Sequence, residues 1–298
     1  MDYEAFHDES QASGYWHGIL LVPMLSKARV CELLTKARAT TRYQAPLSMK
    51  RVSKPNRVFD CAKAWLTIGL AAMSSKWGAD PIPIFLGQAK PGIWEYTLLR
   101  EQLGLKFILF RERDNLSAMN LHTDYGSKVE TTFRMALKGG LHFMGDEDHP
   151  IAIQRLHFDG HRHYHRHIDA ARIVGRISGL RGYCHIANRP DLVDDASSDH
   201  TRGDAQGYDD CQLLQLSDLL IGSFRAALLG PESELRARLS YSAASLLLRF
   251  AQGPARMANS RWRKSFWLSQ CYIEDGTWRF QPLEAEAPDY GTQLTFLQ

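Results

Sequence analysis

Three aspartates stand where a carboxylate is unusual. Asp8 ends the alternating segment 2–8, and Asp159 follows the alternating segment 151–158. Period two predicts that each aspartate ends a β-strand. Asp218 lies within LQLSDLLIG, where helical periodicity places it on the flank of a leucine-rich face. An ionised carboxylate there is costly unless it is paired or binds a cation.

Strand ends and one helix can bring such carboxylates together from distant parts of the chain. Clustered carboxylates raise each other's pKa unless a cation neutralises them. Oxygen ligands favour Mg²⁺ or Mn²⁺, and two ions about 3.5–4 Å apart can promote phosphodiester hydrolysis. Taken singly, each aspartate has an ordinary explanation: Asp8 and Asp159 could cap turns. Asp210 is an alternative acid, although we expect it to be a helix N-cap.

Five histidines and two arginines crowd the run 157–167, which contains Asp159. His161 and His163 are our candidates for gripping phosphate or relaying protons beside the metals. The alternative is an exposed polar connection whose histidines have no role. These histidines could also bind zinc, but alternating spacing in a loop fixes no coordination geometry.

Two basic segments are candidates for contacting a nucleic-acid backbone. The first lies within residues 41–57, and the second interleaves basic and aromatic side chains within residues 256–267. Aromatic rings could stack on bases there, but a helix with a solvated face would give the same pattern. The candidates are Lys50, Arg51, Lys54, Arg57, Arg261, Arg263 and Lys264.

Periodicity along the rest of the chain predicts the elements that position these residues. The expected strands are 2–8, 15–23, 82–86, 106–111, 151–158 and 182–187. The expected helices are 27–40, 58–75, 98–104, 126–138, 167–180, 211–229 and 233–252. This order predicts an α/β fold, a mixed sheet flanked by helices. We expect a single domain with an insertion at about 41–145 and a C-terminal helical extension at about 231–298.

Composition excludes several classes of protein. The 298 residues are 44% hydrophobic and 23% charged, which is typical of a globular chain and not of a disordered one. The formal charge of +3 alone does not indicate a nucleic-acid partner. Five cysteines without a CxxC pair argue against a zinc knuckle. The acidic N-terminus does not suit a signal peptide. We therefore expect a soluble cytoplasmic protein with no membrane partner.

The segment ending in Asp8-Glu9-Ser10, the LHFDG strand end and the LQLSDLLIG helix together resemble the domain of unknown function 3800 family. That family has a DESG-like start and a QLADL-like helix near the end. The chain departs from this pattern at Gln11, in place of glycine, and at Ser217, in place of alanine. Neither departure removes a carboxylate, but roughly half of the chain between these motifs has no aligned motif.

The resemblance implies an RNase H-like fold with an acidic metal site. The ligands it implies are Asp8, Asp159 and Asp218, with Glu9 as a fourth. It also implies a role in defence or mobile-element biology.

The predicted function is a metal-dependent nuclease, a hydrolase that cuts RNA or DNA by a two-metal mechanism with Mg²⁺ or Mn²⁺. The alternative is a non-catalytic module that binds nucleic acid or protein on the same scaffold. A third reading is a metal-dependent phosphoesterase acting on small molecules. The sequence leaves open RNA versus DNA, endo- versus exonuclease action, oligomeric state and the need for a partner protein.

Overall fold

The computed structural model describes residues 1–11, 14–73, 103–113, 125–145, 150–159, 184–195, 205–251 and 265–282. The predicted strand 82–86 and helix 167–180, with most of helix 98–104, lie outside these residues.

A seven-stranded sheet forms the centre of the molecule, in the order β5-β4-β1-β2-β3-β6-β7. β2 is antiparallel to both β1 and β3, whereas β4 is parallel to β1 and to β5, and β3 is parallel to β6. This mixed sheet, flanked by helices, is consistent with an RNase H-like α/β fold. The strands are β1 (Asp2–Ser10), β2 (Tyr15–Pro23), β3 (Lys106–Glu112), β4 (Ile151–Asp159), β5 (Cys184–Asp195), β6 (Phe266–Glu274) and β7 (Thr277–Pro282).

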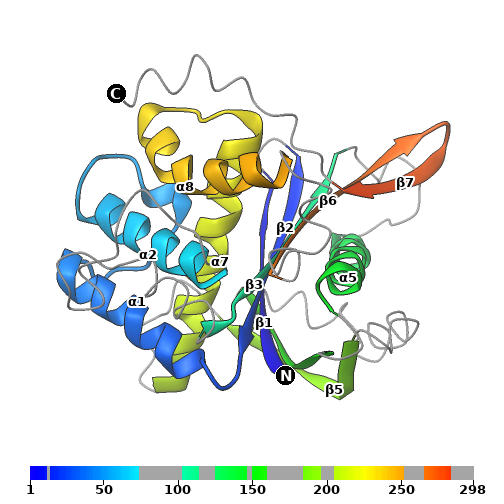
Figure 1. Ribbon diagram of the computed structural model, residues 1–298, viewed down its shortest axis with the longest axis horizontal. Helices are drawn as coiled ribbons and strands as arrows, with labels where there is room; N and C mark the ends of the chain where they lie inside the picture. Colours follow the sequence, from blue (N-terminus) through cyan, green and yellow to red (C-terminus); the bar gives the residue numbers. More distant parts are fainter. Residues whose placement is uncertain are drawn as a thin grey trace.

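Helices cover both faces of the sheet (Figure 1). On one side, α7 (Ala205–Leu229) packs directly on the sheet, and α1 (Lys27–Thr41), α2 (Arg57–Met73), α8 (Glu234–Ala251) and the short 3-10 helix η1 (Met49–Arg51) pack on α7. The other face packs against α5 (Tyr125–Met144). Each face buries its own apolar core, because alternate residues of a strand point to opposite sides. Phe6 and Leu20 belong to the α7 core, and Ala5 and Ile19 to the α5 core.

An irregularity in β4 decides which way its last residues point. Ile151 and Ile153 belong to the α5 core. The register with β1 then shifts, so that Tyr3 pairs with Ile153 but Glu4 pairs with Arg155. A bulge of this kind adds one residue and reverses the alternation beyond it. Asp159 therefore comes to the α7 face of the sheet.

The segment predicted as an insertion, about 41–145, supplies parts of the core. β3 pairs with β2 on one side and β6 on the other. Its residues Phe107 and Ile108 are buried on opposite faces, as an interior strand requires. α2 and α5, from the same segment, pack on opposite faces of the sheet. The limits of an insertion stay a prediction.

The C-terminal extension is helical only in part, which corrects the prediction for 231–298. α8 is a helix, but β6 and β7 form an antiparallel hairpin at the edge of the sheet. Asp275 and Gly276 turn the chain with φ of 50° and 68°. Two positive φ values match a two-residue hairpin turn, for which Asp-Gly is a favoured pair. The sequence contained this signal between two runs of β-forming residues.

Among the described residues, no single helix is both long and apolar enough to cross a membrane. Residues 207–229 and 234–241 meet the criteria only when taken together, and they are bent by 108° at the break between them.

Candidate metal centre

The structure brings Asp8, Asp159 and Asp218 together on the α7 face of the sheet. β1 and β4 run in parallel, and the paired residues His7 and Phe158 directly precede two of the aspartates. The charges of Asp218 and Asp159 both raise the pKa of Asp8. All three side chains are partly exposed, so that an ion or a substrate can reach them. Their assignment as metal ligands stays a prediction.

Close packing of α7 against the first two strands places Asp218 beside Asp8. The Ser217 hydroxyl donates weakly to the carbonyl oxygens of Phe6 and Gly18, at 3.4 and 3.5 Å. Gly18 pairs with Asp8 across β1 and β2. A Cβ atom at Gly18 would lie 2.6 Å from Cδ1 of Ile221. Only a glycine allows so close an approach at this position.

Burial is the largest cause of the raised pKa of Asp8, followed by the charges of Asp218 and Asp159. The backbone N–H of Glu9 donates to Oδ1 of Asp8 at 2.8 Å and opposes the rise. Without a cation, this carboxyl therefore holds its proton to higher pH than an ordinary aspartate. A divalent cation would relieve the repulsion and favour the ionised form.

Asp218 also has a raised pKa, again chiefly because of burial. The Met49 N–H donates to its Oδ2 at 2.6 Å, and nearby Lys50 and Arg236 carry positive charge; all three favour the ionised form. The charge of Asp159 instead raises the pKa of Asp218. This hydrogen bond fixes the orientation of the Asp218 carboxylate.

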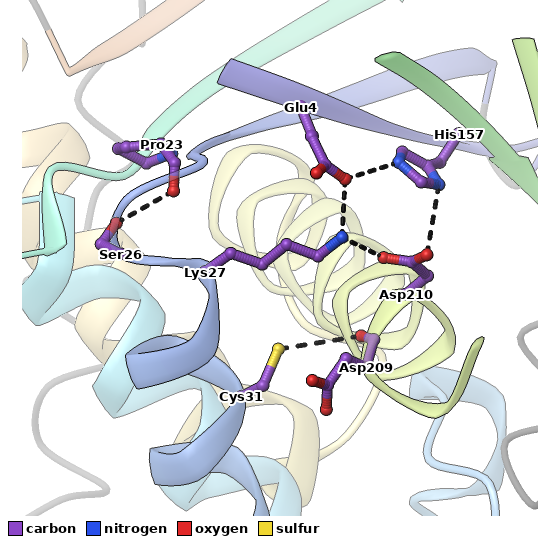
Figure 2. Close-up of polar contacts among 8 residues, drawn as sticks. All are labelled: Glu4, Pro23, Ser26, Lys27, Cys31, His157, Asp209 and Asp210. Atoms are coloured by element: carbon purple, nitrogen blue, oxygen red, sulfur yellow. Dashed lines mark hydrogen bonds and ion pairs between the residues drawn. The ribbon is translucent and has the colours of Figure 1, made fainter. Parts of the chain in front are cut away.

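A second group of ionisable residues lies on the same face of the sheet and consists of Glu4, Lys27, His157 and Asp210 (Figure 2). Lys27 Nζ is 2.6 Å from Oε2 of Glu4 and 2.5 Å from Oδ1 of Asp210. His157 Nε2 is 2.8 Å from the same Glu4 oxygen, and its Nδ1 is 3.9 Å from Oδ2 of Asp210. Among the described residues, Glu4, His157 and Asp210 are the three whose possible ligand atoms all lie within 4.8 Å of one another. The three aspartates are more widely spaced.

This second group is a buried ion-pair network, because Lys27 already supplies its cation. Burial opposes ionisation of Glu4, but hydrogen bonds from His157 and Lys27, with their charges, outweigh it and lower the pKa of Glu4 to about 2. Burial likewise opposes the charge on Lys27, yet the two carboxylates raise its pKa overall. The predicted N-cap role of Asp210 is wrong: α7 begins at Ala205, so Asp210 lies inside the helix, where it pairs with Lys27.

The distance between the two groups is about the same along β1 as along α7. Glu4 and Asp8 are four residues apart, about 13 Å along a strand. Asp210 and Asp218 are eight residues apart, about 12 Å along a helix. Strand and helix therefore carry acids at the same interval. In the group around Glu4 and Asp210, Lys27 lies between the carboxylates. The group around Asp8 and Asp218 also contains Asp159.

The predicted fourth ligand, Glu9, points to the other face of the sheet. Neighbouring residues of a strand alternate between faces, so Glu9 lies on the side opposite to Asp8. There its carboxylate accepts a hydrogen bond from the Tyr15 hydroxyl, and Tyr15 belongs to the α5 core. The structure therefore does not bring Glu9 into the aspartate group.

A buried arginine attaches the loop before η1 to α7. The Arg38 guanidinium donates to Gln212 at 3.2 Å, to Gln215 at 2.7 Å and to the Ala45 carbonyl at 2.8 Å. Gln215 Oε1 also accepts the N–H of Leu47 at 2.8 Å. These bonds hold the backbone that leads to Met49 and its contact with Asp218.

Four of the predicted nucleic-acid contacts lie on and after this loop. Lys50, Arg51, Lys54 and Arg57 are exposed, and the charge of Lys50 reaches Asp218. This segment, which we call the basic loop (residues 50–57), thus begins beside the aspartate group. The remaining predicted residues, His161, His163, Arg261, Arg263 and Lys264, lie outside the described residues.

Two arginines near the aspartate group were not predicted. Arg236 influences the pKa of Asp218, and Arg225 influences that of Arg236. Arg225 stands seven residues after Asp218, two helical turns along the same face, and this spacing was a signal in the sequence. Arg236 lies on α8, and only the packing of α8 on α7 brings it close.

No protein-family model, no curated protein and no solved structure matches the chain. The resemblance to the domain of unknown function 3800 family stays a prediction.

Proposed function

We propose that this chain is a metal-dependent nuclease whose ions are held by Asp8, Asp159 and Asp218. The observation that supports this most directly is their convergence: residues from β1, β4 and α7 form one partly exposed group of acids, in which the charges of Asp159 and Asp218 raise the pKa of Asp8. Such a group is costly without a cation. Its all-oxygen composition fits Mg²⁺ or Mn²⁺.

We propose two ions because phosphodiester hydrolysis needs both an activated water and a stabilised leaving oxygen. Two ions about 3.5–4 Å apart would supply both. The Met49 N–H engages Oδ2 of Asp218 and thereby orients the carboxylate, whose Oδ1 would bind the ion.

A nucleic-acid substrate suits the charges around this site. The exposed basic loop begins beside Asp218, and exposed lysines and arginines attract a phosphate backbone. A small-molecule phosphoesterase would have no use for a basic segment extending away from its site. With this function we also propose a cytoplasmic location and a role in defence or mobile-element biology.

The test is cleavage of labelled RNA, single- and double-stranded DNA and RNA–DNA hybrid in Mg²⁺ or Mn²⁺. We expect Asp8→Asn and Asp218→Asn each to reduce the cleavage rate by about 100-fold or more, since even residues that only support metal ligands contribute 10- to 100-fold. The matched control is Asp275→Asn in the exposed β6–β7 turn, which should cleave normally.

The same samples separate the nuclease from a binding module. Mn²⁺ should raise the melting temperature of the wild-type protein and of Asp275→Asn. The increase should be much smaller for Asp8→Asn and Asp218→Asn. Nucleic-acid binding without cleavage in any metal would instead support the non-catalytic module. Cleavage that survives unchanged in both Asp8→Asn and Asp218→Asn would refute the proposed site.

A further inference from the structure

Arg225 is fixed at the edge of the aspartate group. It follows Asp218 by two turns of α7 and therefore lies on the same side of the helix, about 10 Å further along. Its Nη1 donates to the hydroxyl of Ser10 at 2.7 Å. Ser10 follows Asp8 by two residues, so both point from β1 toward α7. Strand and helix thus orient the guanidinium beside the acids.

Arg236 reaches the same place from α8. Gly230, with φ of +91°, ends α7, and Figure 1 shows α8 lying across the upper end of α7. The Ser233 hydroxyl accepts the backbone N–H of Arg236 at 3.3 Å, as an N-cap does. This turn directs the first part of α8, and with it the side chain of Arg236, toward Asp218.

The two guanidinium groups repel each other, because the charge of Arg225 acts on Arg236. Burial lowers the pKa of Arg236, the charge of Arg225 lowers it further, and Glu232 and Asp218 oppose this. In the part of the chain that the structure describes, the Arg236 guanidinium makes no hydrogen bond or ion pair. Arg225 has an acidic neighbour in Glu232, but their atoms are 3.8 Å apart and Glu232 is 70% exposed, so this pair is weak.

We propose that Arg225 and Arg236 bind a backbone phosphate of the nucleic acid adjacent to the phosphodiester that is cut. The inference rests on the proposed nuclease function. A phosphate between two guanidinium groups would relieve their repulsion and accept paired N–H donors from each fork. Lys50 from η1 and Arg236 from α8 both lie near Asp218, so cations from two separate elements can hold the substrate across the aspartates.

Phosphate contacts position a substrate but carry no sequence information. The pair should therefore increase affinity for every sequence to the same extent. Because it holds a phosphate that does not react, its loss should raise KM far more than it lowers kcat.

The experiment compares Arg225→Gln, Arg236→Gln and the double variant with Arg29→Gln, an exposed α1 arginine that pairs with Glu32. Binding of a labelled oligonucleotide is measured without divalent metal over a range of salt concentrations. We expect each lost contact to reduce the slope of log K against log salt by about 0.7–0.9. Arg29→Gln should keep the wild-type slope, and Arg225→Lys should keep more affinity than Arg225→Gln.

Arg236→Gln is the cleaner variant, because it breaks no guanidinium hydrogen bond to any residue that the structure describes, and it should fold normally even if Arg225→Gln does not. An unchanged affinity and salt slope in Arg236→Gln would overturn the proposal. If the arginine variants weaken binding but the protein cleaves nothing, the nuclease function fails and the phosphate site stands. If the protein cleaves nucleic acid and the arginine variants bind and cleave as wild type does, the nuclease function stands and the phosphate site fails.

Discussion

Neighbouring charges shift the pKa values of two acids on the same face of β1 in opposite directions. Glu4 lies between Lys27 and His157, and its pKa falls to about 2. Asp8, four residues on, lies beside Asp159 and Asp218, and its pKa rises. Both side chains experience burial, which favours the neutral form. The sign of the nearby charges therefore decides that ionisation of Glu4 is favoured in the fold, whereas ionisation of Asp8 is opposed unless a cation lies beside it.

Lys27→Met should destabilise the fold by about 3–5 kcal/mol, because it leaves the carboxylates of Glu4 and Asp210 buried without their cation. The measurement is urea unfolding at pH 7. The control is Lys36→Met, which removes an exposed ion pair with Glu32 and should change the free energy of unfolding by no more than about 0.5 kcal/mol. Equal effects of the two substitutions would contradict the role assigned to Lys27.

The same network should show in the dependence of stability on pH. The pKa of Glu4 is lower in the folded protein, about 2, than its ordinary value of 4.5. Its contribution is therefore complete above pH 4.5 and is lost as the pH falls from there toward 2. Part of this loss should disappear in Lys27→Met but remain in Lys36→Met, as measured by unfolding at several pH values.

At the scale of elements, α7 organises the site. Its residues make the ion pair with Lys27, the hydrogen bonds to Arg38 and the close contacts with β1 and β2. The same helix carries Asp218 and Arg225. Because one rigid helix holds all these groups, shifting η1 or the first strands against it should affect the site before it affects the fold.

Gly222→Ala tests the contact between α7 and η1. A Cβ at position 222 would lie 2.9 Å from Cβ of Met49 and closer still to its Cγ. η1 would have to move, and the Met49 N–H would lose Asp218. We expect cleavage to fall by about 10- to 100-fold, as for other residues that orient metal ligands, with destabilisation of about 1–3 kcal/mol.

The matched control is Gly140→Ala on α5, where a Cβ would lie 2.9 Å from Cγ2 of Ile108. It overpacks the opposite face of the sheet and should cost similar stability without reducing the rate per folded molecule. Thermal unfolding and cleavage assays on the same preparations distinguish the two. Loss of activity in Gly140→Ala equal to that in Gly222→Ala would mean that general destabilisation, not the η1 contact, is responsible.

At the scale of the whole molecule, charge is arranged locally although the total is only +3. The basic loop is exposed and begins at the aspartate group. Long-range attraction of a polyanion depends on such a local concentration of charge and is screened by salt. The net charge of the chain therefore says little about its affinity for nucleic acid.

Replacing Lys50, Arg51, Lys54 and Arg57 together by Gln should weaken binding of every nucleic-acid sequence. Each contact that is lost should reduce the slope of log K against log salt by about 0.7–0.9. Fluorescence anisotropy at several salt concentrations measures this. The control replaces exposed Arg29, Lys36 and Arg279 by Gln. A slope that stays at the wild-type value after loss of the loop charges would exclude the loop from the interface.

Sequence periodicity alone determined most of the described elements. β2 has the predicted bounds, and α1, α2, β3 and α8 agree with prediction to within one or two residues, because burial of one face imposes a period that can be read directly. The β6–β7 hairpin was missed, although its Asp-Gly turn was visible. The start of α7 was also missed, and with it the location of Asp210 inside the helix.

The sequence also singled out acids that stand where a carboxylate needs a partner. It could not decide which of them meet. That depended on the bulge in β4, which turns Asp159 toward α7, and on Gly18 and Gly222, which let α7 and η1 approach. Lys27 comes to lie between Glu4 and Asp210 for the same reason, whereas the orientation of Glu9 toward the other side of the sheet follows from strand alternation alone. Periodicity specifies a residue's face within one element, whereas contact between elements is fixed only when all of them pack together.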